Sequence, residues 1–517
     1  MAAQTLIERG AHVTMLDAGL RDGRYEGLIP DRTFVDIRNT SEEQHRFFLG
    51  DNFEGVPTGG IATGAQLTPP RQVIVRETDR FLQYRSKNFT PMESLAYGGL
   101  GAGWGLGCCV FSEAELQLAG LDPSEMRGAY QTIASRIGVS GSADDARPYT
   151  FDHVEGIQPA TPLDPTCGSL LEAYGRKRTA LRNRGFRLGR PALALLTRDM
   201  DGRSATHRRE MEFYDDLDRA AWRPWITVDR LKESPRFRYV DGLLVMSFTE
   251  DDGVVQVRAL DIHTLEERIF ACRRLILATG ALGSARIVLR SGVVGDKGLP
   301  LLCNPYSYLA TVVPSRIGAT SPALNNALGQ LTLFHETENE EDGIALGALY
   351  PYRSLLLFRL ALQMPLGMSD ALALSRYLQP ALVIAGIHHP DRPSPRKAVR
   401  RVSGPGPTAD ALRIEFGLDD RERHRVARRE REYVRALRML GAWTLRRISP
   451  TFGSSIHYAG TLPFSSAPRN GRLDPSGRLH GFVNVYVADG SGFSYLPAKS
   501  LTWSLMANAH LVAKRLA

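Results

Sequence analysis

The residues best suited to chemistry in this 517-residue chain lie in a glycine-rich segment, Gly98–Gly107. Six of these ten positions are glycine. Backbone without side chains can approach a ligand closely and direct its N–H groups at an anion. The segment therefore predicts a nucleotide-binding loop, and a glycine-rich turn beside a packed helix is the alternative.

A carboxylate, Asp17, ends the apolar run Ala11–Leu16 and is followed by Ala18-Gly19. In a βαβ nucleotide-binding unit, an acid at the tip of the second strand accepts hydrogen bonds from ribose hydroxyls. An ordinary α/β strand end explains the same pattern. No G-x-G-x-x-G precedes this strand in the printed sequence, and the loose match Gly404–Ala409 contains two prolines and predicts a loop.

The segments that must position these groups follow an α/β pattern. Arg274–Gly280 predicts a buried parallel strand, and Ala281–Arg290 has helical spacing. From Phe237 to Phe270 the pattern is strand-like and predicts a small meander, with strands at Gly242–Phe248, Val254–Val257 and Glu267–Phe270. Near the C-terminus, Val483–Ser491 predicts a strand with a turn, and Thr502–Leu516 a helix of small and apolar residues.

Residues 300–450 have a different composition. An apolar helix is expected near 354–378, strands at Ala381–Ile387 and Ala411–Phe416, and a long basic helix after them. This succession predicts a second domain built from a sheet with covering helices.

The net charge of +8 is concentrated in one part of the chain. Between Arg392 and Arg447 there are 16 basic and 7 acidic residues. Because apolar residues of this segment, Val426, Tyr433 and Leu437, share one helical stripe, the arginines are interpreted as a solvated helix face. Nucleic-acid binding is not expected, and the 43% hydrophobic and 23% charged composition is that of an ordinary globular protein.

The five cysteines form no C-x-x-C pair, so neither a metal site nor a disulfide framework is predicted. The N-terminus lacks a signal-peptide pattern, and a cytoplasmic protein is expected. The apolar stretch Ser354–Met368 is shorter than the ~20 residues of a spanning helix. Within it, Leu355–Leu362 is interpreted as a buried helix, with a monotopic membrane contact as the less favoured alternative.

Five blocks taken together resemble the glucose-methanol-choline (GMC) oxidoreductase family, including its cholesterol-oxidase-like and pyranose-oxidase-like branches. The blocks are Val13–Gly19, Gly98-Gly99 with Trp104-Gly105, Leu275–Ser284 with Ser291-Gly292, His457–Thr461, and Gly481–Ala507. The resemblance implies an α/β fold, α+β overall, in which a Rossmann-like FAD-binding domain accompanies a substrate domain with a mostly antiparallel sheet. The FAD-binding domain would comprise residues 1–150, 226–300 and 451–517, and the substrate domain residues 151–225 and 301–450.

The resemblance also implies site residues. His457 matches the family's general base, and an imidazole with a pKa near ~6.5 can accept a proton at neutral pH. The second active-site position falls on Ser500, with Lys499 beside it as a substitute donor. His388-His389 either faces the substrate or is a surface feature at a strand end, and the surface interpretation is favoured. The residues expected to bind FAD are Asp17, Gly19, Gly98, Gly99, Gly101, Trp104, Gly105, Val245, Ala278, Gly280, Asp489 and Gly490.

The activity implied is FAD-dependent oxidation of an alcohol group of a small-molecule metabolite by hydride transfer to the flavin. The printed sequence departs from the family in lacking the G-x-G-x-x-G segment that supports the pyrophosphate. Either that segment lies upstream of the printed start, or the chain is a non-catalytic relative that no longer binds FAD. The sequence indicates neither the electron acceptor nor the oligomeric state.

Overall fold

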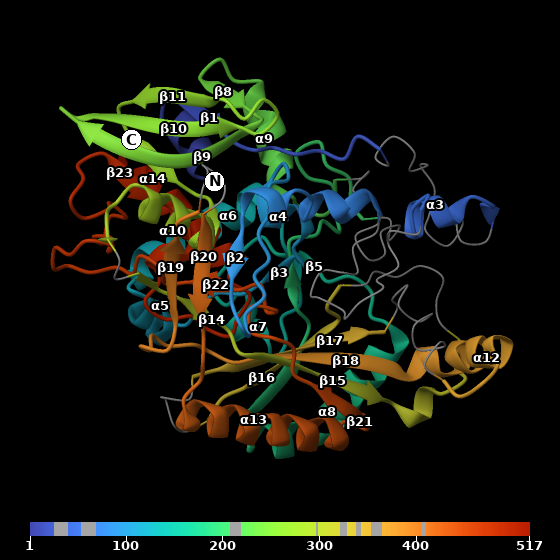
Figure 1. Cartoon of the computed structure of the whole chain (residues 1–517). Coiled ribbons are helices and arrows are strands. Elements are labelled where there is room, and N and C mark those ends of the chain that lie inside the picture. Colours follow the sequence, from blue (N-terminus) through green and yellow to red (C-terminus); the bar gives the residue numbers. More distant parts are fainter. Residues whose placement is uncertain are drawn as a thin grey trace.

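The computed structural model describes residues 1–24, 40–52, 69–206, 219–295, 298–320, 328–337, 343–352, 364–404 and 410–516. This part of the chain has a mixed α/β fold, as predicted. Short parallel strands with helices and a three-stranded meander lie at one end of the molecule, and a six-stranded antiparallel sheet lies at the other (Figure 1). The predicted domain boundaries stay a prediction.

The nucleotide-type strands form two parallel pairs in the described residues. Strand β1 (Val13–Leu16) pairs with β8 (Phe237–Val240), and β12 (Leu275–Leu277) pairs with β23 (Val485–Val487). The helices of this part are α1 (Ala2–Glu8), α10 (Gly280–Arg290) and α14 (Thr502–Leu516). The strands predicted around Val13, Leu275 and Val485 and the helices that follow Gly280 and Thr502 are thereby confirmed.

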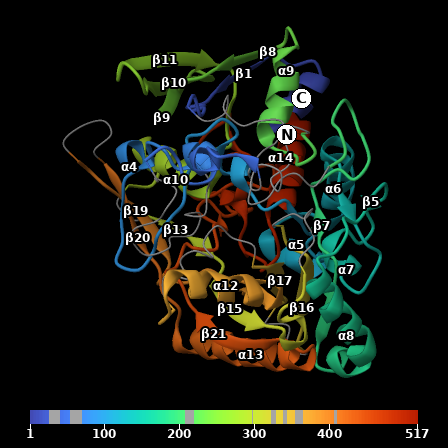
Figure 2. The same cartoon turned by 90° about the vertical axis from the view of Figure 1, so that its right-hand side faces the viewer.

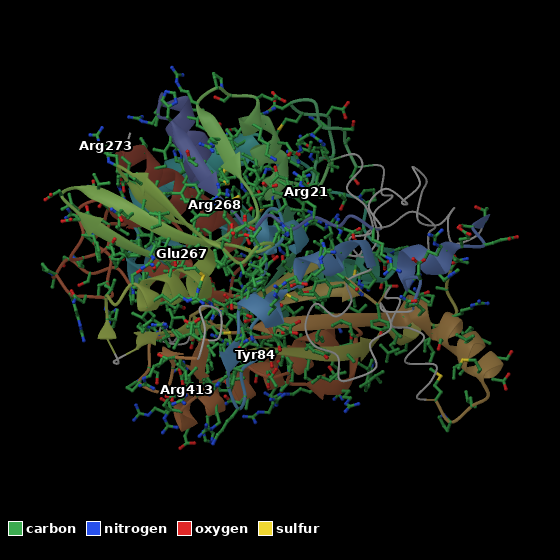
Figure 3. All side chains as sticks on the ribbon, turned by 45° about the horizontal axis from the view of Figure 1, so that its top comes forward. Arg21, Tyr84, Glu267, Arg268, Arg273 and Arg413 are labelled. Atoms are coloured by element: carbon green, nitrogen blue, oxygen red, sulfur yellow. The ribbon has the colours of Figure 1, made fainter. Side chains whose placement is uncertain are left out.

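The predicted meander is also confirmed. Strands β9 (Leu243–Asp251), β10 (Val254–Asp261) and β11 (Glu267–Cys272) pair antiparallel in sequence order. The β9–β10 turn is Asp252-Gly253, and both residues have positive φ. Asp-Gly is a favoured pair for such tight hairpins because both residues tolerate the left-handed conformation. The exposed side chains of β11 include the charged Glu267 and Arg268 (Figure 3).

The large sheet has the strand order β21–β15–β18–β17–β16–β6. The bounds of these strands are β6 Phe186–Gly189, β15 Tyr306–Val312, β16 Leu331–His335, β17 Ala345–Pro351, β18 Leu382–His388 and β21 Trp443–Ile448. Apolar side chains such as Leu309, Val383 and Ile387 are fully buried in a core shared with α8 (Pro165–Arg182) and α13 (Asp420–Met439). Figures 1 and 2 show both helices beside one face of the sheet.

Helix α13 is the predicted basic helix. It begins with a capping box in which the Asp419 side chain accepts from Glu422 N–H and the Glu422 side chain accepts from Asp419 N–H. Tyr433 and Leu437 are fully buried, whereas most of its arginines are at least partly exposed. The interpretation as a helix with a solvated basic face is confirmed, although Arg429 itself is buried.

Of the apolar helix predicted near 354–378, the structure shows α12 (Met368–Leu378). Leu355–Leu362 and most of Gly404–Ala409 lie outside the described residues. In the part of the chain that the structure describes, no helix is long and apolar enough to span a membrane.

Candidate functional site

His457 is positioned by a short pair of strands. It precedes β22 (Tyr458–Ala459), which pairs antiparallel with β14 (Leu302–Cys303). Because Cys303 lies opposite Tyr458, Asn304, the residue that follows β14, comes beside His457. The residue before His457, Ile456, has φ 58°, which is an outlier for a β-branched residue and typical of functional sites.

The Asn304 amide determines which nitrogen of His457 carries the proton. Its Nδ2 donates to the carbonyl oxygens of His389 at 2.8 Å and Pro497 at 3.1 Å, so its Oδ1 must be the atom that faces His457. Oδ1 lies 2.9 Å from His457 Nδ1. Since an amide oxygen can only accept, Nδ1 donates, and the neutral ring carries its lone pair on Nε2.

His457 Nε2 is available to a reacting molecule. The ring is half-buried, and Nε2 has no hydrogen-bond partner in the described residues. Burial lowers the pKa of His457 to about 4. The imidazole is therefore neutral at pH 7 and can act as a proton acceptor.

The histidine pair at the end of β18 does not form a surface feature, so the favoured interpretation was wrong. The His388 ring is half-buried and stacks on His457 with 4.9 Å between centroids and 24° between planes. His389 is only 3% exposed. Burial lowers the pKa of both histidines. The alternation of β18 predicted a strand, but only the tertiary structure shows that its last residue meets His457.

A second turn packs directly against the His457 strand. Asp489 caps the turn Gly490–Gly492, and its carboxylate accepts from Ser284 Oγ at 2.6 Å. Gly460 N–H donates to Gly490 O at 2.9 Å, which joins this turn to the segment that follows His457. Burial raises the pKa of Asp489. The structure thus brings together Asp489, Gly490 and the start of α10, as the predicted cofactor role requires.

Asp17 and its neighbours form a separate group. Tyr239 Oη donates to Asp17 Oδ2 at 2.9 Å, and burial raises the pKa of Asp17. Leu243 N–H donates to Asp17 O, which places the start of β9, and with it Val245, beside the strand end. Tyr239 was not predicted, because its contact with Asp17 joins residues 222 positions apart.

The glycine-rich segment lies next to this group. Leu20 and Ala96 form a parallel bridge that joins the strand end after Gly19 to the chain leading into Gly98. Residues Gly99–Gly103 form a 3-10 turn against α9 (Pro224–Lys232), and a Cβ on Gly101 would lie 2.5 Å from Pro224 Cγ. Trp104 Nε1 donates to Trp222 O at 3.0 Å. Part of this glycine content therefore serves packing, as the alternative interpretation proposed.

Three of the other predicted glycines leave room for a nucleotide cofactor, whereas Gly19 packs closely against Tyr239. A Cβ on Gly99, Gly105 or Gly280 would meet no atom within 4 Å, so these backbones border open space. Ala278 and Gly280, at the end of β12, are exposed. Together with the Asp17 carboxylate, they offer the glycine-lined backbone surface and the ribose acceptor that FAD binding requires.

Ser500 and Lys499 are held by other contacts. The Ser500 hydroxyl lies beside Gly107, whose Cβ would be 2.8 Å away, and it hydrogen-bonds to Cys109. The fully buried Lys499 ammonium donates to Glu115 Oε2 at 2.7 Å and to Val110 O at 3.0 Å. The interpretation of Lys499 as a substitute donor is therefore wrong, and the role of Ser500 stays a prediction.

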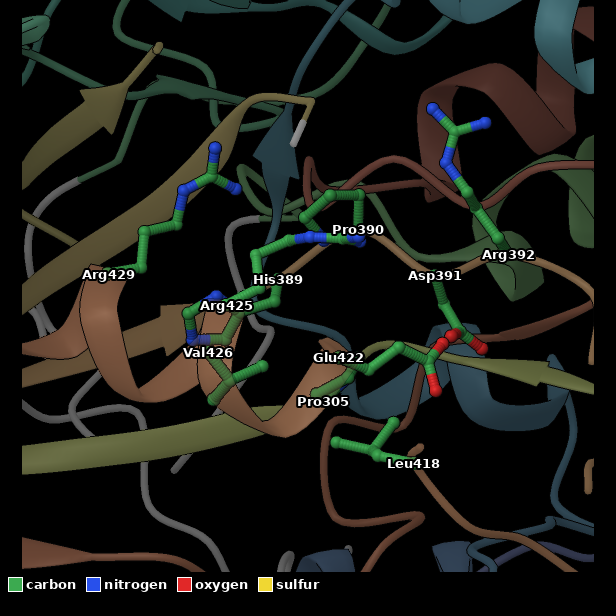
Figure 4. A pocket seen from close by; sticks show the side chains of 10 residues that line it. All are labelled: Pro305, His389, Pro390, Asp391, Arg392, Leu418, Glu422, Arg425, Val426 and Arg429. Atoms are coloured by element: carbon green, nitrogen blue, oxygen red, sulfur yellow. The ribbon is translucent and has the colours of Figure 1, made fainter. Parts of the chain in front are cut away.

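Behind Asn304, a buried ionic cluster fixes β14. Lys397, whose side chain is fully buried, donates to Asp391 at 2.5 Å and to Glu422 at 2.7 Å. Asp391 in turn accepts from Cys303 N–H at 2.9 Å. The adjoining cavity has a volume of only about 20 Å³ (Figure 4), far below the ~300 Å³ of a typical ligand pocket. It supports the site but cannot hold a metabolite.

The structure thus places the half-buried imidazole of His457 beside the Gly490–Gly492 turn of an α/β nucleotide-type fold. Residues 411–509, which include His457, Asp489 and Ser500, match the C-terminal model of the GMC oxidoreductase family. This match confirms the resemblance to the GMC oxidoreductase family for the C-terminal part of the chain. The branch within the family stays a prediction.

Two proteins illustrate the similarity. Paromamine 6'-oxidase from Streptomyces fradiae is 25% identical over 457 residues, which cover 84% of this chain and 76% of that protein. The crystal structure of pyridoxine 4-oxidase from Mesorbium loti matches 100% of this chain and 96% of its own, with a TM-score of 0.58 and 15% identity. The latter match shows a common fold.

Proposed function

We propose that this protein is an FAD-dependent oxidoreductase that oxidises a CH–OH group of a small-molecule metabolite. The observation that carries the proposal is the Asn304–His457 pair, which leaves a neutral Nε2 as an accessible proton acceptor. The match of residues 411–509 to the GMC family model and the oxidase names of both similar proteins support it. A cytoplasmic location is supported by the five free thiols.

The cofactor would be held by two groups of residues. Asp17 would accept from the ribose, and the backbones of Gly98, Gly99 and Gly105 would line the pyrophosphate. Gly280 and the Asp489–Gly490 turn, which packs against the His457 strand, would hold the flavin end. When bound, FAD supplies the acceptor for the hydride that leaves the alcohol carbon.

The chain's own part in the reaction is to receive a proton. The alcohol O–H donates to His457 Nε2, and the proton passes to Nε2 as the C–H bond breaks and the C=O bond forms. The imidazolium so formed is stabilised by Asn304 Oδ1, which accepts from Nδ1–H at 2.9 Å. Since the pKa of His457 is about 4, this base should lose activity only as pH falls through that value.

The test is anaerobic reduction of the protein-bound flavin by alcohols, followed as loss of absorbance near ~450 nm. This measurement needs no knowledge of the electron acceptor. We expect the wild-type protein to retain FAD after desalting and to be reduced by an alcohol. The His457→Gln variant should bind FAD equally but be reduced roughly 10²–10⁴-fold more slowly, because the general base is lost.

Two results would contradict the proposal. Equal rates for the wild-type protein and His457→Gln would remove His457 from the chemistry. A well-folded protein that stays colourless after incubation with FAD would favour the second candidate, a GMC-family protein without flavin or catalysis.

A further inference from the structure

The two faces of the six-stranded sheet have different accessibility. On β15, β17 and β18, side chains alternate between fully buried positions that face α8 and α13 and half-buried positions on the opposite face. In the pairing register, Tyr306 lies opposite His388, Tyr308 opposite Gly386, and Tyr350 opposite Ile384. The accessible face therefore gathers three tyrosines and a histidine on three neighbouring strands.

These rings form a continuous series that leads to His457. The centroids of Tyr308 and Tyr306 are 6.1 Å apart, and those of Tyr306 and His388 are 4.5 Å apart. His388 stacks on His457 at 4.9 Å. These four rings and the Tyr350 ring are half-buried, so each retains surface that a small molecule can contact. We name Tyr306, Tyr308, Tyr350 and His388 the aromatic face.

Two hydroxyl groups converge at the middle of this face. A Cβ on Gly386 would lie 2.7 Å from Tyr306 Oη and 3.2 Å from Tyr350 Oη, so only glycine leaves both in place. Neither hydroxyl makes a hydrogen bond with the described protein. Burial raises the pKa of both tyrosines, that of Tyr350 to about 12, so both hydroxyls keep their protons at neutral pH. They are donors available to a ligand.

We propose that the aromatic face binds the substrate, and that the substrate is a neutral, planar ring with the reacting CH–OH on one side and a hydrogen-bond acceptor on the other. The ring would pack against Tyr306 and His388, because aromatic pairs gain beyond their buried area. The acceptor atom of the ring would accept hydrogen bonds from the Tyr306 and Tyr350 hydroxyls beside Gly386. The alcohol O–H would donate to His457 Nε2. This inference rests on the proposed function and adds the substrate class.

Neutrality follows from the groups present. The aromatic face carries no formal charge at neutral pH, and its two convergent hydroxyls are donors that call for an acceptor. A polyamine sugar would bring several ammonium groups to a face whose members offer no carboxylate to neutralise them.

The experiment compares four alcohols as anaerobic reductants of the FAD-loaded protein at pH 8. 4-Pyridinemethanol has both a planar ring and an acceptor, benzyl alcohol lacks the acceptor, cyclohexanemethanol lacks planarity, and glucosamine represents an amino sugar. We expect the half-saturating concentration to be lowest for 4-pyridinemethanol and about tenfold higher for benzyl alcohol, the value of one hydrogen bond.

Two tyrosine variants test whether the hydroxyls of the aromatic face cause the preference for an alcohol with an acceptor. Tyr306→Phe and Tyr350→Phe keep the rings but should raise the half-saturating concentration of 4-pyridinemethanol about tenfold relative to that of benzyl alcohol. Tyr377→Phe, on the exposed surface of α12, is the matched control. Calorimetric titration with 4-methylpyridine, which cannot be oxidised as an alcohol, should show the same loss of affinity without turnover.

The outcomes separate the two proposals. The aromatic face is not the substrate site as described if glucosamine or cyclohexanemethanol reduces the flavin as readily as 4-pyridinemethanol. The same conclusion follows if the tyrosine variants raise the half-saturating concentration of benzyl alcohol as much as that of 4-pyridinemethanol. In both cases the proposed function stands. If no alcohol reduces the bound flavin, the proposed function itself fails.

Discussion

At the scale of single residues, the chemistry of His457 depends on Asn304. The Asn304 Nδ2 group donates to two carbonyl oxygens, which fixes the orientation of the amide. Its Oδ1 then accepts from His457 Nδ1 and keeps the proton on that nitrogen. Asn304 does not touch the reacting atoms, so it is a positioning residue. Its influence should appear in the pH profile as well as in the rate.

Replacing Asn304 by Asp should keep an acceptor for Nδ1–H but add a negative charge beside the ring. The charge favours the imidazolium, so the pKa of His457 should rise from about 4. The acid limb of the rate of flavin reduction should therefore move to higher pH, by about one to two units. A pH profile measured by stopped-flow checks this.

Asn304→Leu is the matched comparison, because it has a similar size but neither donor nor acceptor. It should slow reduction by about tenfold or more, since the ring loses its tautomer control. An unchanged pH profile in Asn304→Asp, or wild-type rates in Asn304→Leu, would show that the 2.9 Å contact does not position the base.

At the scale of elements, the glycine-rich segment combines packing and open space. Gly101 packs on Pro224, whereas Gly105 borders no atom within 4 Å. Gly105 is also outside the left-handed region, so alanine is not strained there. The two positions allow a cofactor role to be separated from a structural one.

Gly105→Ala should fold with wild-type stability but lose FAD on desalting, because its methyl group occupies space that we assign to the cofactor. Gly101→Ala should lower the free energy of unfolding by about 1–3 kcal/mol, because its methyl group clashes with the rigid ring of Pro224. Urea unfolding and the flavin content after gel filtration measure the two effects. Wild-type FAD retention in Gly105→Ala would contradict this placement.

The element β14 is held by the buried Lys397–Asp391–Glu422 cluster. Lys397→Met keeps the length of the side chain but leaves two carboxylates without their cation. We expect the free energy of unfolding to fall by about 3–5 kcal/mol, as for other broken buried ion pairs. Arg400→Met, which removes an exposed ion pair with Glu415, should change it by less than about 1 kcal/mol.

At the scale of the whole molecule, several buried histidines oppose folding in acid. The pKa of His389 is lowered to about 3, first by burial and then by Arg429 and nearby cations. Below the ordinary value of ~6.5, the unfolded chain binds a proton at this position and the folded chain does not. This histidine should therefore reduce stability as pH falls.

His389→Phe should remove that contribution. Between about pH 6 and 4, the loss of stability should become less steep by up to about 1.4 kcal/mol per pH unit. At pH 8 the variant should be as stable as the wild-type protein or more so, because both ring nitrogens are buried without a partner in the described residues. Urea unfolding at pH 8, 6 and 5 makes the comparison, and an unchanged acid slope would disprove the assignment.

The sequence by itself determined the local features of this protein. Periodicity predicted the β9–β11 meander, the strands at Leu275 and Val485 and the basic helix α13, because alternation and helical spacing are properties of neighbouring residues. The glycine density of Gly98–Gly107 and the order of five short blocks were sufficient to indicate the family.

Only the tertiary structure decided how the base works and what surrounds it. Asn304 and His457 are 153 positions apart, and His388 reaches His457 from another strand. Strand pairing between distant segments makes such contacts, and no local pattern encodes them. The same reason explains why Lys499 was misjudged: its partner Glu115 is 384 positions away, and a buried cation is satisfied by whatever carboxylate the fold brings to it.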